Sequence, residues 1–494
     1  MFYLNFKSRV RVSVFVGLFI HSCFPLVSAA AEPEALAQSS TRPNILYINA
    51  DDLGIMDVGY NTPSFQTPHI DTLASEGMLF TNAYAPAANC APSRAAVHSG
   101  QWSPRHGVYT VKSSARGEDA FRKIIPTTNT FFLPDEVYTM AEALKDGGYQ
   151  TIHLGKYHIG RNPLDDGFDV NVGGDHTGGP QDGYYSPWDA GAMKSWSDTV
   201  EPGTHRIDIY VREAIRFMDA HRDQPMFIHF SPYMVHTPLT AVPEYVDAYG
   251  DTSLNATYAS MVEKLDEAVG RLMTALDELN LSENTLIVFS SDNGGIAAFH
   301  TQFPFRAGKG SYYEGGVRVP LIMRWPGKIA PGRVSDLPVN SLDFYPTFME
   351  VTQIKEPKGL DGKSLIPLMT GKAPSNASTQ FWHFPIYLQA YDEILDDGRD
   401  PLFRTRPGST LRVGNWKLHE YFEDNALELY DLENDPDERN DLSRTKPELT
   451  AQLYQQLLDW RERIKAPIPT QPNPDYDEDV EQAALEKWKN PTSL

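Results

Sequence analysis

Two apolar runs in the sequence each end in side chains that carry oxygen ligands. The runs cover residues 44–50 and 285–291. The side chains that follow them are Asp51, Asp52, Asp292 and Asn293. Carboxylate and amide oxygens suit Ca²⁺ or Mg²⁺, whereas zinc sites usually contain His or Cys. Because clustered carboxylates repel one another without a cation, the pattern predicts a metal site. The alternative is that these residues form turns or cap helices.

A cysteine stands in a second stretch with chemical potential, N-C-A-P-S-R-A-A-V-H-S-G at residues 89–100. Pro92 presets φ near the start of a helix, and the alanines after Arg94 can continue it. Cys90 is therefore predicted at a helix N-terminus, where backbone N–H groups favour negative charge. The other cysteine, Cys23, lies in a predicted leader, so Cys90 would have no intrachain disulfide partner in the mature chain. A buried structural cysteine is the alternative interpretation.

Cationic and imidazole side chains occur in three further short segments. G-K-Y-H-I-G, residues 155–160, places Lys156 and His158 two residues apart after an apolar run, so both can point the same way. Y-M-V-H-T-P-L presents His236, and F-R-A-G-K-G presents Lys309 between glycines. The alternative is an exposed lysine beside histidines that serve packing.

These residues need strands and helices to bring them together. Buried strands are predicted at 44–50, 150–154, 226–230, 285–291 and 321–325, and helices at 207–221, 258–280 and 342–351. The apolar residues of 258–280 recur near helical spacing, which indicates a core-facing stripe. In open α/β sheets, ligands gather at the carboxyl ends of the strands. The oxygen ligands, Lys156 and His236 all follow predicted strands, so we expect them at such an edge.

Taken together, these segments resemble the sulfatase family. C-A-P-S-R at 90–94 resembles its signature, and G-K-Y-H-I-G resembles its G-K-W-H-L-G, with Tyr157 in place of tryptophan. Five such motifs follow in family order across most of residues 42–375. The resemblance implies an alkaline-phosphatase-like α/β/α sandwich with a large, mostly parallel sheet. It also implies a smaller C-terminal subdomain at 376–470, with an antiparallel sheet and a helix at 447–465.

The resemblance also implies a chemistry, the hydrolysis of sulfuric esters. In this family the cysteine is oxidised after translation to formylglycine, whose hydrated aldehyde is the nucleophile; in this chain that position is Cys90. The partner for the oxidation would be a formylglycine-generating enzyme or an anaerobic sulfatase-maturating enzyme. The implied ligands of Ca²⁺, or less favourably Mg²⁺, are Asp51, Asp52, Cys90, Asp292 and Asn293.

The same resemblance implies roles for five further residues. Arg94 would steady the hydrate and offset nearby carboxylates. Lys156 and Lys309 would bind the sulfate oxygens. His158 would hydrogen-bond the hydrate and assist the expulsion of sulfate, and His236 would protonate the leaving oxygen. Two alternatives stay open: a phosphoester or phosphonate hydrolase of the same superfamily, and a non-catalytic sulfated-glycan binder with an unmodified cysteine.

The two ends of the sequence and its net charge indicate the location of the protein and the partners that it does not bind. Residues 1–29 combine basic residues, a short apolar core and V-S-A, which is typical of a secretory signal. We therefore expect a secreted or periplasmic protein; a cell-surface lipoprotein modified at Cys23 is the weaker alternative. The net charge of −22 argues against nucleic-acid binding, and no later segment predicts stable membrane insertion. Residues 471–494 are acidic and proline-rich, which predicts a poorly ordered tail.

The expected substrate is a sulfated carbohydrate, either a polysaccharide or an oligosaccharide. An exported enzyme meets extracellular polymers, and the loop at 167–189 is rich in Gly, Asp and aromatic residues that suit a sugar ring. That loop would contribute His176, and F-W-H-F-P-I-Y at 381–387 would contribute His383 from the other side. The alternative is that these aromatic residues pack a seam between domains.

Overall fold

The computed structural model describes residues 42–250, 252–372, 379–392 and 395–489. The predicted secretory signal and the predicted domain boundary between residues 375 and 376 lie outside these ranges. All described residues belong to one unit that spans 41–494. None of the helices in the described ranges is long and apolar enough to cross a membrane.

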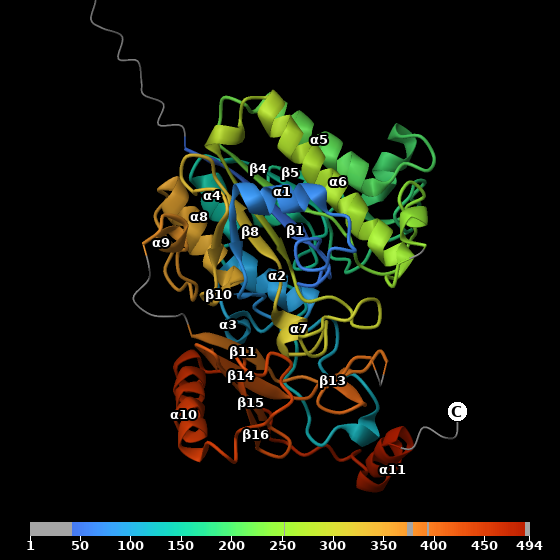
Figure 1. The fold of residues 1–494 in the computed structure, drawn as a ribbon, viewed down its shortest axis with the longest axis vertical. Coiled ribbons are helices and arrows are strands. Elements are labelled where there is room, and N and C mark those ends of the chain that lie inside the picture. Colours follow the sequence, from blue (N-terminus) through green and yellow to red (C-terminus); the bar gives the residue numbers. More distant parts are fainter. Residues whose placement is uncertain (1–41, 251, 373–378, 393–394, 490–494) are drawn as a thin grey trace, which may run out of the picture. The chain divides into compact units, whose positions relative to one another are not determined.

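The framework is an eight-stranded, mostly parallel sheet, of which strands β1, β4, β5 and β8 are labelled in Figure 1. In spatial order these strands are β5 (Val170–Val172), β4 (Gln150–Gly155), β6 (Met226–Ser231), β1 (Asn44–Ala50), β7 (Thr285–Ser291), β8 (Leu321–Arg324), β2 (Met78–Phe80) and β9 (Arg333–Ser335). Neighbours from β5 to β7 run parallel, β8 is antiparallel to β7 and β2, and β9 is parallel to β2. In β1, Ile48 pairs with Phe230 of β6 and Phe289 of β7. The predicted α/β sheet is confirmed.

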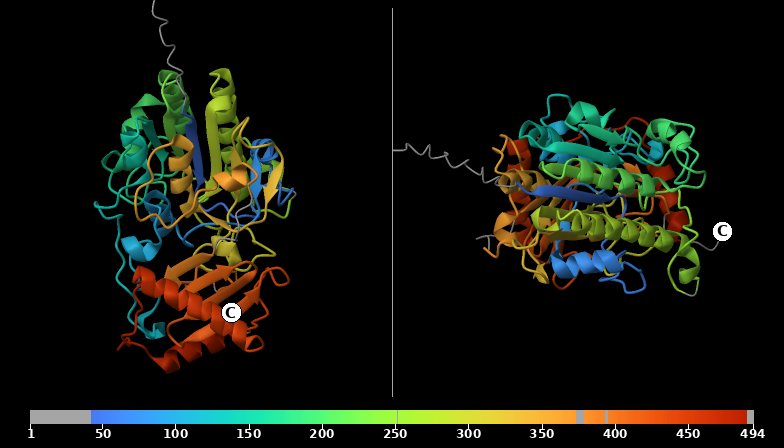
Figure 2. Two further views of the ribbon diagram at one scale, coloured as in Figure 1. Left: turned by 90° about the vertical axis from the view of Figure 1, so that its left-hand side faces the viewer. Right: turned by 90° about the horizontal axis from the view of Figure 1, so that it is seen from above.

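Helices cover both faces of this sheet. Successive side chains of β1 point to opposite faces, and those on each face pack in a separate apolar core with the helices that cover it. The longer helices of this region are α1 (Pro68–Glu76), α2 (Cys90–Ser99), α4 (Met140–Asp146), α5 (Arg206–Ala220), α6 (Ala256–Glu278) and α8 (Phe344–Thr352). Leu46 and Ile48 pack with α1, α5 and α6, whereas Ile45 and Tyr47 pack with α2, α4 and α8. Helices α5 and α6 lie side by side (Figures 1 and 2). This is the expected α/β/α sandwich.

A second sheet, drawn in orange and red in Figure 1, is antiparallel. Its strands, in spatial order, are β11 (Gln380–Phe384), β14 (Gly408–Val413), β15 (Trp416–Tyr421) and β16 (Ala426–Asp431). Helix α10 (Pro447–Ile464) packs on this sheet through Leu453, Leu457 and Trp460. The antiparallel C-terminal sheet and its helix are therefore confirmed.

Shorter elements connect these layers. They are α3 (Ser103–His106), α7 (Glu314–Val317), α9 (Ile366–Met369), β3 (Ala83–Tyr84), β10 (Val339–Asn340), β12 (Leu388–Gln389), β13 (Phe403–Thr405), and the 3₁₀ turns η1 (Asp119–Phe121), η2 (Pro163–Asp166), η3 (Gly191–Thr199), η4 (Val246–Tyr249), η5 (Ser282–Asn284) and η6 (Ser341–Asp343). The stretch 167–189, predicted as a loop, contains the sheet strand β5, which pairs with β4.

The tail that composition predicts to be poorly ordered is ordered in its described part. Helix α11 (Glu478–Lys489) forms there. Glu481 is buried, and its Oε1 accepts a hydrogen bond of 2.9 Å from Arg406 Nη2. The carbonyl of Gln471 accepts a bond of 2.8 Å from the amide of Ile125. Because Arg406 is itself buried and needs carboxylate partners, it stabilises the docking of an acidic segment.

Candidate active site

The carboxyl ends of the central parallel strands gather the predicted oxygen ligands. Asp51 and Asp52 follow β1, and Asp292 and Asn293 follow the neighbouring strand β7. All four side chains are buried. One ligand atom from each of Asp51, Asp52, Cys90 and Asp292 lies within 4.8 Å of the others. The fold therefore brings together residues that are up to about 240 positions apart in the sequence.

Helix α2 begins at Cys90 and presents its thiol to these carboxylates. The Sγ atom lies 3.6 Å from Asp51 Oδ1 and 3.7 Å from Asp52 Oδ1. Burial would raise the pKa of the Cys90 thiol, but the charges of Lys156 and Lys309 lower this pKa below its usual value. A negatively charged group at this position is thus stabilised by two lysines and by the helix N-terminus.

Each carboxylate of the cluster contacts a buried cation. The three pairs are Lys156–Asp51 at 2.8 Å, Lys309–Asp52 at 2.6 Å and Arg94–Asp292 at 2.7 Å. Arg94 also donates from Nη1 to the carbonyl of Lys156 at 2.9 Å, which ties α2 to the end of β4. Loss of any one partner would leave a buried charge unpaired, which is strongly destabilising.

The cluster contains a polar atom that a metal ion would satisfy. Asn293 Nδ2 donates to Asp52 Oδ1 at 2.8 Å, and this contact orients the amide. The Asn293 Oδ1 atom is buried and has no hydrogen-bond partner. Buried polar atoms are nearly always paired, so this oxygen and the three carboxylates fit a hard cation such as Ca²⁺ or Mg²⁺.

The imidazole of His236 faces the same cluster. Its Nδ1 lies 2.6 Å from the carbonyl oxygen of Thr237, and its Nε2 lies 3.8 Å from Asp52 Oδ2. Burial and the two site lysines disfavour the charged ring, but the carboxylates of Asp51 and Asp52 raise the pKa of His236 above its usual value. The ring can therefore hold a proton on Nε2 near neutral pH.

His158 differs from His236 in its surroundings. Its side chain is buried, and its Nδ1 has no hydrogen-bond partner. Burial, with the nearby charge of Lys156, holds the pKa of His158 well below its usual value. This ring is therefore neutral and can act as a hydrogen-bonding group.

A cavity of about 740 Å³ opens beside the cluster. The predicted residues that line it are Cys90, His158, His176, His236 and Lys309. His176 thus lies in the same cavity as Cys90, and its role in substrate binding stays a prediction. Lining residues that the sequence analysis missed are Lys112, Arg116, Phe131, Phe132, Tyr391 and Arg404. They come from separate segments without a shared motif, so only the folded chain identifies them.

His383 does not reach this cavity, which corrects its predicted role in substrate binding. Its ring is buried and meets the ring of Trp460, in helix α10, edge-on. Nδ1 lies 2.8 Å from Ser409 Oγ, and Nε2 lies 2.8 Å from the carbonyl oxygen of Pro467. Burial lowers the pKa of His383 to about 3. Both ring nitrogens are therefore engaged in holding the C-terminal subdomain together.

The aromatic residues of the stretch 167–189 also pack inside the protein. Tyr184 and Trp188 belong to the main core, and the Tyr184 hydroxyl donates to the carbonyl of His236 at 2.6 Å. These two rings therefore serve packing, but they pack in the core of the main domain and not at a seam between domains. The exposed rings of the cavity wall are instead Phe131, with 60% of its surface exposed, and Tyr391, with 56%.

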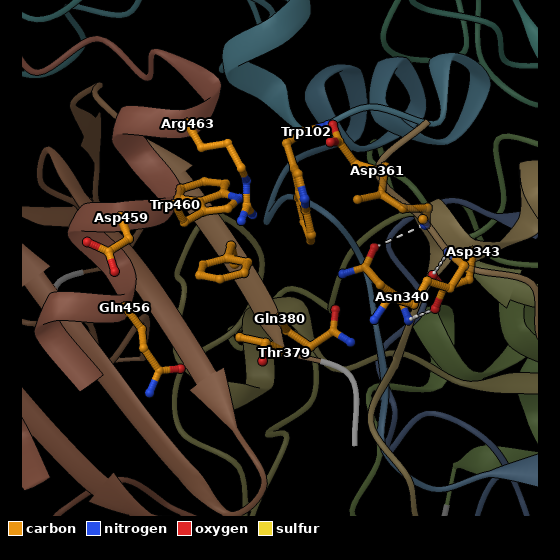
Figure 3. Close-up of a pocket in the computed structure, with 14 residues that line it drawn as sticks. Trp102, Asn340, Asp343, Asp361, Thr379, Gln380, Gln456, Asp459, Trp460 and Arg463 are labelled. Carbon is orange, nitrogen blue, oxygen red and sulfur yellow. Dashed lines mark hydrogen bonds between the residues drawn. The ribbon is translucent and has the colours of Figure 1, made fainter. Parts of the chain in front are cut away.

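A separate cleft of about 520 Å³ contains none of the predicted catalytic residues (Figure 3). The rings of Phe381 and Trp460 stack there at 4.6 Å, and Trp102 meets both edge-on. Asn340 and Asp343 cap the short turn η6 at the same place. These contacts join α10 to the main domain, so we assign this cleft a structural role.

Comparison with known proteins identifies families and relatives that this chain resembles. Residues 43–354 match the family described as Sulfatase, and residues 307–463 match the one described as N-sulphoglucosamine sulphohydrolase, C-terminal. A sulfatase of Formosa agariphila is 30% identical, with 88% of this chain and 92% of the relative covered. An N-acetylgalactosamine-6-O-sulfatase of Bacteroides thetaiotaomicron is 28% identical, with 85% and 93% covered. The crystal structure of Ps i-CgsB in complex with k-i-k-neocarrahexaose is 27% identical, has a TM-score of 0.70, and covers 92% of this chain and 100% of its own.

The fold is thus that of the alkaline-phosphatase-like hydrolases, as predicted. The chain belongs to the sulfatase family, and its activity is that of a sulfuric ester hydrolase.

Proposed function

We propose that this enzyme removes sulfate from a sulfated carbohydrate, using formylglycine at position 90 and a Ca²⁺ ion. The observation that carries the proposal is the convergence of three carboxylates on the Cys90 thiol. The adjacent cavity of about 740 Å³ supports a substrate of saccharide size. Two relatives support the carbohydrate class, since one is named as an N-acetylgalactosamine-6-O-sulfatase and the other was solved with a neocarrahexaose.

The residues present fit both implied groups. Asp51, Asp52, Asp292 and Asn293 would hold Ca²⁺ beside residue 90, with Mg²⁺ the less favoured ion. When bound, the ion would supply Lewis-acid polarisation and orientation of the sulfate group. Formylglycine would supply a hydrated aldehyde as the nucleophile. A formylglycine-generating enzyme or an anaerobic sulfatase-maturating enzyme would be needed to produce it.

The side chains around Cys90 would bind the sulfate. Lys309 lines the cavity, whereas Lys156 is fully buried and its ammonium group lies 2.8 Å from Asp51. Both ammonium groups already lower the pKa of the group at position 90, so they are close enough to offset the charge of a sulfate there. Arg94 would hold Asp292 in place and steady the nucleophile through its position on α2.

Two histidines would handle protons. The contact of His236 Nδ1 with the Thr237 carbonyl leaves Nε2 to hold a proton for the leaving oxygen. His158 is neutral and lines the cavity beside Cys90, so it would hydrogen-bond the nucleophile and assist the release of sulfate. The predicted secretory signal supports an exported enzyme, secreted or periplasmic, that meets such substrates outside the cytoplasm.

The test is turnover by protein that has been produced together with each maturation enzyme. Inorganic sulfate released from defined sulfated saccharides is measured beside phosphate released from matched phosphate esters. We expect sulfate release that Cys90→Ala abolishes. A preference for the phosphate esters would instead identify the phosphoester hydrolase. Saccharide binding without turnover by fully matured protein would identify a glycan-binding protein.

A further inference from the structure

The cavity beside Cys90 has a charge that contrasts with the rest of the protein. The chain has 65 Asp and Glu residues against 43 Lys and Arg residues. Yet none of the described residues that line this cavity is acidic, whereas Lys112, Arg116, Lys309 and Arg404 all line it. A cationic cavity in an acidic protein concentrates an anionic ligand.

The site of sulfate hydrolysis does not account for all of these cations. Lys309 is paired with Asp52 and belongs to the cluster around Cys90. In the described part of the chain, Lys112, Arg116 and Arg404 form no ion pair or hydrogen bond with the carboxylates of that cluster. They therefore add positive charge beyond what one sulfate group and its metal site require.

The guanidinium group of Arg404 is fixed by hydrogen bonds from two of its nitrogen atoms, and the third nitrogen atom has no partner among the described residues. Its Nε donates to the carbonyl of Gln389 at 3.0 Å, and its Nη1 donates to the carbonyl of Lys309 at 3.1 Å. Its guanidinium stacks on Tyr391, with Cζ 3.3 Å from the ring centre. The nearest carboxylate oxygen, on Asp396, lies 3.8 Å from Nε. The side chain is almost completely buried, yet its Nη2 atom has no hydrogen-bond partner in the described part of the chain.

Arg116 is the second cation with an unused donor. Within the described part of the chain its guanidinium has no ion pair, and its Nε is buried without a hydrogen-bond partner. Burial, followed by the charge of Arg404, lowers the pKa of Arg116. Two guanidinium groups that repel each other and keep buried, unpaired N–H groups are unfavourable unless an anion joins them.

We propose that Arg116 and Arg404 together bind a second anionic group of the substrate, so that the preferred saccharide carries at least one anion besides the sulfate ester that is cleaved. This inference rests on the proposed function of the site. Guanidinium groups form strong, charge-assisted hydrogen bonds with sulfate and carboxylate oxygens alike. The exposed rings of Phe131 and Tyr391 provide apolar walls for the sugar that joins the two anions.

The test compares saccharides that share one sulfated sugar. The probes are N-acetylgalactosamine 6-sulfate, its 4,6-disulfate, and the disaccharide of glucuronic acid with N-acetylgalactosamine 6-sulfate. We expect wild-type kcat/KM to be higher for one of the dianionic probes than for the monosulfate. The probe that is preferred tells whether the second anion is a sulfate or a carboxylate.

The variant Arg116→Gln isolates the second anion, because Arg404 also contacts Lys309 and its loss would disturb the sulfate site. We expect the dianion-to-monoanion ratio of kcat/KM to fall by about 10- to 100-fold in this variant, the range for losing a hydrogen bond to a charged group. Arg116→Lys should recover part of the ratio. The matched control is Arg444→Gln, at an exposed residue outside the cavity, which should keep the wild-type ratio.

Binding to the Cys90→Ala protein, measured by calorimetry with the same probes, separates this inference from the proposed function. If matured enzyme releases no sulfate but Cys90→Ala binds the dianions more tightly and Arg116→Gln removes that preference, the second-anion site stands and the hydrolytic proposal fails. If sulfate is released but the wild-type ratio is near one, or is unchanged by Arg116→Gln, the second-anion site is wrong. Absence of any binding preference also overturns it.

Discussion

Replacement of Lys417 by methionine tests the buried charge network that joins the C-terminal sheet to the segment carrying Lys309. Lys417 lies on β15 and is fully buried. Its Nζ is 2.9 Å from Glu314 Oε1 and 3.1 Å from Glu438 Oε1. Glu314 begins helix α7, which follows Lys309 in the chain, and its amide donates to Glu438 Oε2 at 2.5 Å.

The expected loss of stability follows from the charges that Lys417→Met leaves in the protein interior. Two buried carboxylates lose their shared cation, and removal of one partner of a buried ion pair destabilises by about 3–5 kcal/mol. The unfolding entropy is about 2.1 cal/mol/K per residue, so for a unit of this size Tm should fall by about 3–5 °C. A fall in kcat/KM should accompany this, because α7 and the Lys309 segment share the network.

Calorimetric melting at neutral pH, with parallel measurement of sulfate release, is the assay. Lys358→Met, at an exposed lysine, is the matched control and should melt like the wild type. Adding Glu438→Gln to Lys417→Met removes one uncompensated charge and should recover part of the lost Tm. If Lys417→Met melts within about 1 °C of the control, which is less than the loss expected for a broken buried pair, the reasoning is refuted.

Three further predictions concern the metal, the leaving oxygen and pH. Exhaustive chelation should abolish sulfate release and lower Tm, and Ca²⁺ should restore both, whereas Asp292→Ala should stay inactive because it lacks a metal ligand and the nearest carboxylate partner of Arg94; full activity of metal-free protein would argue against the ligand set. His236→Gln should lower kcat/KM by about 10²- to 10⁴-fold on saccharides and less on aryl sulfates, whose leaving oxygen needs no proton, and equal losses on both would rule out the general acid. Burial raises the pKa of Asp266 to about 7. At about pH 6 the folded state therefore keeps a proton on this carboxyl group that the unfolded chain releases. The stability that the protonated group contributes is lost as the pH rises through the folded pKa. The Tm of Asp266→Asn relative to the wild type should therefore increase between about pH 5 and about pH 8, and a constant difference would contradict this.

Local patterns predicted those parts of the site that follow strands or begin a helix. Asp51 and Asp292 come directly after apolar runs that form neighbouring parallel strands, and α2 starts at Cys90. These positions depend on short segments and on one general property of parallel sheets, so the sequence alone could locate them.

Residues whose surroundings come from distant segments could not be placed in this way. Arg116 and Arg404 meet only because the C-terminal subdomain packs beside the segment after α3. His383 lies in an aromatic segment that suggests a sugar site, but Ser409 and Pro467 occupy both its ring nitrogens. The ordered tail likewise depends on a buried partner, Arg406, that lies 75 positions from Glu481.

Mass spectrometry of the tryptic peptide that contains Cys90, made on the preparation whose sulfate release is measured, is the most direct test of the proposed chemistry. Preparations are produced with graded amounts of maturation enzyme, so that the fraction of aldehyde at position 90 varies. Specific activity toward a sulfated saccharide should rise in proportion to that fraction and vanish when only thiol is present. Undiminished sulfate release by protein whose Cys90 is entirely thiol would contradict the formylglycine mechanism.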